Sequence, residues 1–299
     1  MALAVYTTIY PGVEAYLPDW YRSLSKQTDQ EFQLWIGLDT LGKEFVQTIL
    51  GPGVNAEWVI APSGSTPAEI RQQALARIVE TSTDVVLVDS DDLLHPSRVA
   101  AARQALQSSE LAGCALRLVD QQGKDLSLTF DLPPQLEPED VFPRNNVFGF
   151  SNSAYRAELL RRCFPIPANA VLVDWFLATR AWLLGATLAF DRVPRMDYRQ
   201  HPANTARVRL PFSRDQVISD TALVRRHYQL VLAESTCDFV AGRYAELRRA
   251  ARALEEFHQN VVRHPAQLDA YVEALNALAP PPLWWSSVAY PALEPTWKS

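Results

Sequence analysis

Short apolar runs alternate with amphipathic stretches over roughly the first 110 residues of the chain. Leu3 to Ile9, Phe32 to Leu38 and Glu57 to Ile60 have the length and composition of strands. The segments between them repeat apolar residues at helical spacing. This alternation predicts βαβ units and therefore an α/β fold with a mostly parallel sheet.

The helices of this half are predicted from spacing and from start signals. Val13 to Leu24 and Pro96 to Leu106 repeat apolar residues with a helical period. Thr66, Pro67 and Glu69 form a typical helix start, with a capping hydroxyl, a proline at the first helical position and an acid in the first turn. We expect that helix to run to about residue 80.

The strand predicted over Asp84 to Val88 runs directly into Asp89-Ser90-Asp91-Asp92. Acids at the carboxyl end of a buried strand lie at the sheet edge where open α/β folds bind ligands. Three carboxylates in four residues repel one another unless a cation lies between them, and oxygen ligands suit Mg²⁺ or Mn²⁺. A solvated acidic turn that caps the following helix is the alternative interpretation.

The second half of the chain is less regular. Cys114 to Val119, Leu126 to Phe130 and Phe148 to Tyr155 resemble strands. Asp174 to Leu184 is predicted to be a helix with Asp174 as its N-cap. After about residue 213 the sequence becomes helical, over 216–234 and 244–262, and it ends in a tail rich in Pro and Trp.

Composition narrows the class of protein. The 299 residues are 48% hydrophobic and 21% charged, which excludes a disordered or fibrous chain. The formal net charge of −6 provides no general attraction for nucleic acid or anionic lipid. A phosphate-bearing ligand would therefore need a metal ion or a few well-placed arginines.

Three well-separated cysteines, Cys114, Cys163 and Cys237, fit neither a disulfide framework nor a metal knuckle, so we expect a reducing compartment. The N-terminus has no basic leader, and the most apolar stretch, Val171 to Phe190, contains charged residues and fails as a membrane span. We expect a cytoplasmic protein, with peripheral contact at the inner face of the membrane left open.

Six segments carry motifs in a recognisable order along the chain. They are the first strand and helix, with Tyr10-Pro11 and Leu17 to Thr28; Phe32 to Asp39, a strand ending in an acid; Gly64 to Arg71; Asp89 to Pro96, with the pattern D-x-D; Asp174 to Arg180, similar to an "EDW" segment; and Tyr198 to Thr205, similar to a "YRxHxxNxS" segment. Together they resemble the segments of the family 2 glycosyltransferases, which have the GT-A fold, in the family's order and over residues 3 to about 207.

The resemblance implies a nucleotide-binding set at the strand ends. It assigns Thr7, Thr8 and Tyr10 to the pocket, Asp39 to the base, Arg71 to the nucleotide, Asp89 to the ribose and Asp91 to the metal that bridges the diphosphate. Read without the resemblance, the same residues are ordinary strand, turn and surface-helix positions. The implied donor is a nucleotide-diphosphate sugar, with a UDP-sugar favoured over a GDP-sugar.

The resemblance also implies the chemistry. Asp91 is the candidate ligand of Mn²⁺ or Mg²⁺, and His201 is a candidate further metal ligand or phosphate contact, with an ordinary loop histidine as an equal alternative. Asp174 is the candidate catalytic base, which takes the proton of the acceptor hydroxyl as it attacks the anomeric carbon with inversion. The metal would stabilise the departing nucleoside diphosphate.

The chain departs from the family pattern at several positions. Val173 replaces the acid that usually precedes the catalytic Asp, and Asp39-Thr40-Leu41-Gly42 replaces the usual Asp-Asp-Gly-Ser. The Q-x-x-R-W signature of processive membrane synthases is absent, which favours transfer of one sugar at a time.

We therefore predict a metal-dependent, inverting, non-processive hexosyltransferase. Its expected acceptor is a hydroxyl of a saccharide or lipid-linked glycan, as in polysaccharide biosynthesis. The alternative is a non-catalytic nucleotide- or carbohydrate-binding relative on the same scaffold. A sugar-phosphate nucleotidyltransferase would need a Gly-rich loop after the first strand, and a Rossmann dehydrogenase would need GxGxxG; the chain has neither.

We expect two regions along the chain. Residues 1–212 would form the GT-A domain, with a nucleotide-binding half over 1–110 and an acceptor-side half over 111–212. Residues 213–299 would form a helical extension with the Pro/Trp-rich tail. For the aromatic residues of the tail, packing on the chain's own domain is favoured over docking on a membrane, a partner or a lipid carrier. They are Trp284, Trp285, Tyr290 and Trp297.

Overall fold

The computed structural model describes residues 2–51, 53–201, 204, 210–233 and 238–298. Pro202, Ala203 and Thr205 of the expected closing segment lie outside the described residues, as does Cys237. Cys114 and Cys163 are buried free thiols.

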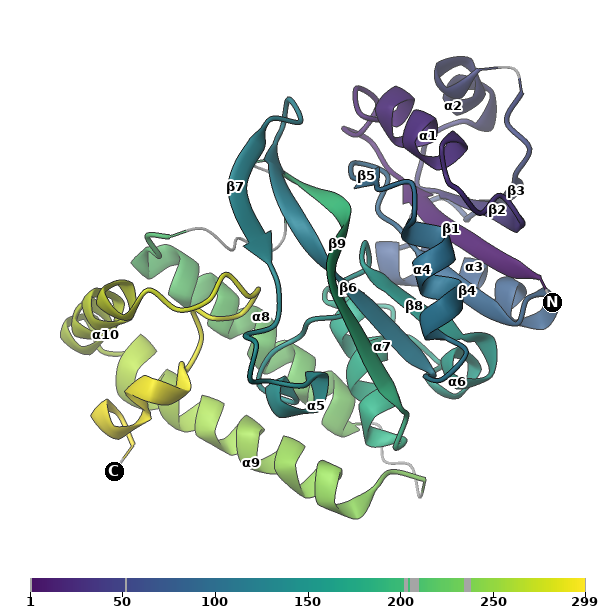
Figure 1. Ribbon diagram of the computed structural model, residues 1–299. Helices are drawn as coiled ribbons and strands as arrows, with labels where there is room; N and C mark the ends of the chain where they lie inside the picture. Colours follow the sequence, from purple (N-terminus) through teal and green to yellow (C-terminus); the bar gives the residue numbers. More distant parts are fainter. Residues whose placement is uncertain (1, 52, 202–203, 205–209, 234–237, 299) are drawn as a thin grey trace.

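One nine-stranded sheet forms the centre of the described structure, and helices cover both of its faces (Figure 1). Strands β3, β2, β1, β4, β6 and β9 run in one direction, and β8, β5 and β7 run against their neighbours. The predicted mixed, mostly parallel α/β sheet is therefore confirmed. In sheet order the strands are β3 (Glu57–Ile60), β2 (Phe32–Leu38), β1 (Leu3–Ile9), β4 (Asp84–Leu87), β8 (Ser153–Arg156), β6 (Leu111–Asp120), β9 (Leu188–Gln200) and β5 (Leu93–Leu94), with β7 (Asp125–Phe130) beside β6.

The helices fall into two groups. The first seven lie between or beside the strands, and α8, α9 and α10 lie together on one side of the molecule, away from α1 and α2 (Figure 1). They are α1 (Leu17–Ser25), α2 (Lys43–Leu50), α3 (Pro67–Thr81), α4 (Arg98–Ala105), α5 (Pro138–Val141), α6 (Ala157–Arg162), α7 (Val173–Leu183), α8 (Arg214–Ala233), α9 (Ala241–Phe257) with a π-helical continuation (His258–Val262), α10 (Pro265–Leu278) and a final 3₁₀ helix (Pro291–Thr296).

The strands and helices with the strongest local signals form as predicted. All seven residues of β1 are buried, as expected for a continuous apolar strand in a parallel sheet. Helix α3 begins with the predicted capping box, in which the Thr66 hydroxyl accepts from the Glu69 N–H and the Glu69 carboxylate accepts from the Thr66 N–H.

Three local predictions were wrong. Helix α1 begins at Leu17 rather than Val13, with Pro18 in the first turn, where its missing N–H costs no helical hydrogen bond. The expected strand over 148–155 is reduced to β8, and the residues before it form a loop with buried aromatic side chains. Asp174 is not an N-cap, because α7 already begins at Val173; it lies in the first helical turn instead.

Strand β9 is the longest strand of the sheet, and the hydrophobic pattern does not reveal it. Its 13 residues are mostly half-buried and carry many charges, so neither alternation nor an apolar run marks it. Its pairing with β6 shifts register between Cys114 and Leu116, which face Asp191 and Met196. Pro194 lies in this irregular stretch, where a residue without an N–H is tolerated.

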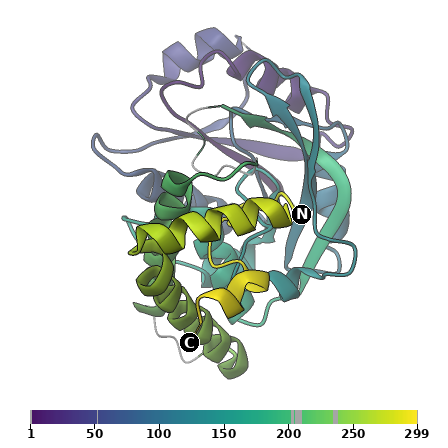
Figure 2. The ribbon, with the colours of Figure 1, turned by 90° about the vertical axis from the view of Figure 1, so that its left-hand side faces the viewer.

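The C-terminal tail packs on the chain itself, as predicted. Trp284, Trp285 and Trp297 are each at most 7% exposed. Figure 2 faces this side of the molecule, with α9, α10 and the tail in the foreground. Among the described helices, none combines the length and apolar character that a membrane span requires.

Candidate active site

The parallel strands bring most of the predicted site residues to one edge of the sheet. β1 ends at Ile9, β2 at Leu38 and β4 at Leu87, so Tyr10, Asp39 and the acidic turn follow the carboxyl ends of neighbouring strands. β9 runs in the same direction and ends just before His201. This edge is the expected ligand-binding edge of an open α/β sheet.

Asp91 and His201 form the centre of the site. The His201 Nε2 atom lies 2.8 Å from Asp91 Oδ2, and the Tyr10 hydroxyl donates to the same oxygen over 3.2 Å. The two side chains are only 8% and 9% exposed. Tyr16 stacks on the His201 ring at 5.7 Å, which fixes the plane of the imidazole.

The donor atoms of this pair suit a divalent cation. Carboxylate oxygen and imidazole nitrogen both bind Mn²⁺, and hard divalent ions commonly take few protein ligands and complete their shell with substrate oxygens and water. No group of three or more His, Cys, Asp or Glu side chains within the described ranges is placed to hold a metal. Asp91 and His201 could supply two ligands to such an ion, and substrate oxygens and water would complete its shell.

Arg199 connects the acidic turn to the end of β9. Its Nε donates to the Asp91 carbonyl over 2.7 Å, and its backbone N–H donates to Asp92 Oδ1 over 2.7 Å. Its guanidinium also lies 4.6 Å from the Tyr16 ring centroid and donates to the Gln121 carbonyl. The residue is 2% exposed, so it holds the acidic turn and the end of β9 together from inside the fold.

Ser151 connects the same turn to the loop before β8. Its hydroxyl donates to the Asp92 carboxylate and accepts from the Asp89 N–H. Burial, followed by the nearby carboxylates of Asp91 and Asp89, raises the pKa of Asp92 well above its usual range. Asp92 is thus a buried hydrogen-bonding residue of the turn, and its carboxylate contacts Ser151 and Arg199.

Arg71 reaches the acidic turn from α3. Its guanidinium nitrogen lies 3.6 Å from Asp89 Oδ1, and its carbon lies 4.2 Å from the Phe150 ring centroid. Burial raises the pKa of Asp89 to about 7, the Arg71 charge opposes that rise, and the carboxylates of Asp91 and Asp174 add to it. A cation at this place would favour the charged form of the Asp89 carboxyl.

Asp174 lies close to this group, at the start of α7. The Asn146 side-chain amide donates to its Oδ2 over 3.3 Å, and Asn146 is itself held by two hydrogen bonds with the backbone of Phe148. Burial raises the pKa of Asp174, and the Trp175 N–H and the Arg71 charge oppose the rise. A half-buried carboxylate with a raised pKa is suited to accept a proton.

Thr8 and Asp39 make hydrogen bonds that stabilise the strand ends, and Thr7 is a buried strand residue. Thr8 lies 3.0 Å from the Tyr6 hydroxyl, and its carbonyl accepts from Ser90. Thr7 is fully buried, and its hydroxyl has no hydrogen-bond partner in the described parts of the chain. The Asp39 N–H donates to the Ile9 carbonyl, which holds the ends of β1 and β2 together. Contact of these three side chains with a nucleotide stays a prediction.

Sequence reasoning missed several residues that hold the site. Arg199 and Asn204 lie within the segment Tyr198 to Thr205, but no role was predicted for them. Asn146 lies in a segment without a recognisable pattern, and Ser151 was assigned to the strand expected over 148–155, whose first half is a loop. The only available signal was the combination of small polar residues with apolar aromatics over 146–152.

Comparisons with known proteins support the fold. No protein-family model matches the sequence, and no curated protein matches it significantly. Among solved structures, the chain is similar to residues 1–349 of TarS from S. aureus, with a TM-score of 0.59 and 17% identity over 93% of this chain and 79% of that one. This chain spans only 48% of the length of a longer TarS structure, to which it is similar with a TM-score of 0.57.

A mannosyltransferase from Pyrobaculum calidifontis, PcManGT, is also similar. It was solved in complex with GDP-Man and Mn²⁺, and it matches 93% of this chain and 74% of its own with a TM-score of 0.56 and 14% identity. Both proteins are glycosyltransferases of the GT-A type. The chain has the GT-A fold. Structural similarity at 14–17% identity shows the GT-A fold alone, and the activity depends on the residues of the site.

Proposed function

We propose that this GT-A protein is a metal-dependent, inverting glycosyltransferase that moves one sugar at a time from a nucleotide-diphosphate donor to a hydroxyl of a saccharide or lipid-linked glycan. One observation carries the proposal. At one edge of the sheet a buried Asp91–His201 pair suited to a divalent cation lies beside Arg71 and Asp89. Arg71 is also close enough to Asp174 to lower its pKa, and Asp174 is close enough to Asp89 to raise the pKa of Asp89.

Asp174 is the proposed catalytic base. Its carboxylate would accept the proton of the acceptor hydroxyl while that oxygen forms a bond to the anomeric carbon. The bond from that carbon to the diphosphate breaks at the same time, and its electron pair leaves with the diphosphate. The raised pKa of Asp174 makes it a stronger base, and Asn146 orients the accepting oxygen.

The other polar residues would bind and orient the donor. Lewis-acid stabilisation of the departing diphosphate is what a Mn²⁺ or Mg²⁺ ion held by Asp91 and His201 would supply. The Arg71 guanidinium would add a fixed positive charge beside the diphosphate. Tyr10 would keep Asp91 in its present orientation through the 3.2 Å hydrogen bond.

We propose a UDP-sugar as the first candidate donor and a GDP-sugar as the second. TarS has been solved with UDP and with UDP-GlcNAc, and the mannosyltransferase with GDP-Man. The two nucleotides are therefore the first to compare.

Nucleoside diphosphate release from a panel of UDP- and GDP-sugars with Mn²⁺ tests the proposal. We expect release from one donor, stimulated by a glycan acceptor, and loss of release in Asp174→Asn with nucleotide binding retained. The alternative, a non-catalytic binding relative, rests on Val173, which stands where the family has an acid. Binding of a nucleotide without any release from the panel would favour that alternative.

A further inference from the structure

The tail aromatics Trp284 and Trp285 contact the two segments that hold Asp174. We propose that these two indoles are positioning residues, which fix the orientation of the Asp174 carboxylate from outside the nucleotide site. The inference deepens the proposed function and depends on it for the role of Asp174. It would make the C-terminal extension a required part of the catalytic unit.

Trp285 acts on the helix that carries Asp174. Trp175, the next residue of α7, is fully buried in a stack of three aromatic rings. The His227 ring of α8 lies on one side at 4.4 Å and 16°, and the Trp285 ring contributes a second near-parallel contact at 5.5 Å and 14°. Because Trp175 adjoins Asp174 in the first turn, its position sets the direction of the Asp174 side chain.

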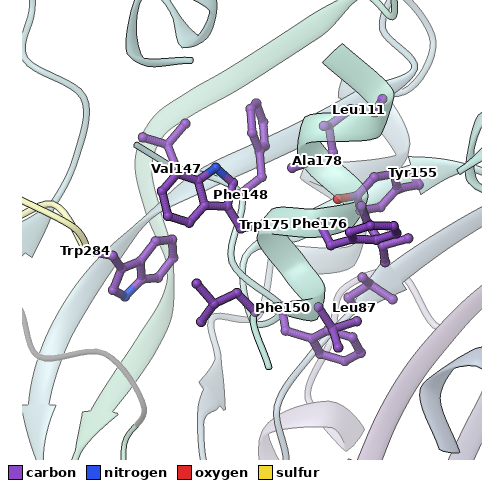
Figure 3. Packing of buried hydrophobic residues seen from close by; sticks show 14 of the residues in the cluster. Leu87, Leu111, Val147, Phe148, Phe150, Tyr155, Trp175, Phe176, Ala178 and Trp284 are labelled. Atoms are coloured by element: carbon purple, nitrogen blue, oxygen red, sulfur yellow. The ribbon is translucent and has the colours of Figure 1, made fainter. Parts of the chain in front are cut away.

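Trp284 acts on the loop that donates to Asp174. A Cβ at Gly149 would come within 2.3 Å of the Trp284 ring, so the indole lies directly on the loop backbone. Asn146, three residues earlier in the same loop, donates to the Asp174 carboxylate. Trp284 also packs at 4.0 Å on Phe130 of β7 (Figure 3 shows Trp284 and Trp175 with Phe148 and Phe150 nearby).

The tail is itself held firmly by the helical extension. The Ser287 hydroxyl donates to the buried Asp220 carboxylate of α8, and the Tyr271 hydroxyl of α10 donates to the Ser287 carbonyl over 3.2 Å. Two helices therefore anchor the chain immediately after the two indoles. This anchoring gives Trp284 and Trp285 a fixed position from which to hold the loop and α7.

The groups facing the Asp174 carboxyl give the arrangement a measurable signature. They are Asn146 of the loop, the Trp175 N–H, the Arg71 charge of α3, the Asp89 carboxyl after β4 and the Tyr155 hydroxyl of β8. Loss of the Trp285 ring would let Trp175 and the first turn move and would admit water to a carboxyl whose pKa burial raises. The pKa of Asp174 would then fall toward its ordinary range.

Matched leucine substitutions in the full-length protein test the inference. Trp285→Leu and Trp284→Leu remove one indole each, and Trp297→Leu is the control, since Trp297 is an equally buried tail residue that packs on Phe257 of α9. Trp285→Phe keeps an aromatic ring in case Trp285→Leu does not fold. The pKa of Asp174 is followed by ¹³C NMR of carboxyl-labelled aspartate, with the resonance assigned from Asp174→Asn.

We expect the Asp174 pKa to fall by about half a unit or more in Trp285→Leu, to change little in Trp297→Leu, and to be partly restored in Trp285→Phe. For the donor found in the panel, we expect kcat to fall about tenfold in Trp285→Leu and Trp284→Leu while the nucleotide Kd changes less than about twofold. Equal effects in Trp285→Leu and Trp297→Leu, or an unmoved Asp174 resonance, would overturn the inference. If the NMR shift appears but the protein releases no nucleotide from any donor, the proposed function is wrong and the positioning role of the two indoles is still supported.

Discussion

The Nε2 atom of His201 lies 2.8 Å from Oδ2 of Asp91, although 110 residues separate the two in sequence. Parallel β4 and β9 end at the same edge of the sheet, and this topology brings the residues together. Tyr10 also donates to Asp91 Oδ2, Arg199 and Ser151 hold the acidic turn through Asp92 and the Asp91 carbonyl, and Tyr16 stacks on the His201 ring. The two side chains are thus already together in the folded protein, as the proposed cation site requires.

Arg199 is expected to control metal affinity without binding the metal. Arg199→Met removes the Nε–H that bonds the Asp91 carbonyl, so the acidic turn and His201 lose their fixed separation. We expect the Kd for Mn²⁺, measured by electron paramagnetic resonance in the presence of the preferred nucleotide, to rise about 10–100-fold. Arg199→Lys should restore little, because an ammonium group cannot reproduce the directed contacts of the guanidinium. An unchanged Kd in folded Arg199→Met would show that the turn keeps its geometry without Arg199.

Asn146 is expected to set the pH dependence of turnover. Its amide N–H stabilises the charged form of Asp174, so Asn146→Ala should raise the Asp174 pKa further above its ordinary value. The base is active only when deprotonated, and the acidic limb of the kcat profile should therefore move to higher pH by about half a unit to one unit. A limb that stays in place, or moves to lower pH, would argue against Asp174 as the base.

His227 is expected to make folding stability depend on pH. Burial lowers its pKa from 6.5 to about 3, so the folded protein keeps the ring neutral where the unfolded chain protonates it. This contribution is present above pH 6.5 and is lost as the pH falls toward 3. Between pH 7 and pH 5 the native protein should lose about 2 kcal/mol more stability than His227→Phe, which keeps a ring against Trp175. Urea denaturation at the two pH values measures the difference, and parallel losses in both proteins would contradict the assignment.

Gly149 is expected to tolerate no side chain. Gly149→Ala drives a methyl group into the Trp284 ring, and overpacking of this kind should cost about 1–3 kcal/mol of unfolding free energy. Gly42→Ala is the control, because nothing lies within 4 Å of its added Cβ and its φ of −72° suits any residue. Equal midpoints for the two variants in urea would mean that the tail is not seated on the loop.

The sequence predicted the parallel half of the fold well, because its signals are local. The apolar runs at β1, β2 and β4 and the capping box of α3 each determine their element within a few residues. β9 was missed because its half-buried, charged residues depend on β6 and β5 for burial. Asp174 lies inside the helix because α7 is apolar almost throughout, so burial fixes where it begins.

The candidate site could be predicted in part. Asp89, Asp91, Asp174 and His201 were singled out from segments that resemble the family 2 glycosyltransferases, and the fold brings Asp91 and His201 into contact. Asn146 and Ser151 act through hydrogen bonds to residues 28 and 59 positions away, which no local pattern encodes. The same is true of Trp285, whose contact with Trp175 exists only after the extension has folded onto α7.

Calorimetric titration of UDP and GDP, each with and without Mn²⁺, tests the central claim most directly, because it needs no knowledge of the acceptor. The account predicts that one nucleotide binds in the presence of Mn²⁺ and weakens at least about tenfold when Mn²⁺ is removed. Asp91→Asn and His201→Ala should lose the same metal-dependent part of the affinity. Binding that ignores Mn²⁺, or that survives unchanged in Asp91→Asn, would contradict a metal-dependent nucleotide site at this edge of the sheet.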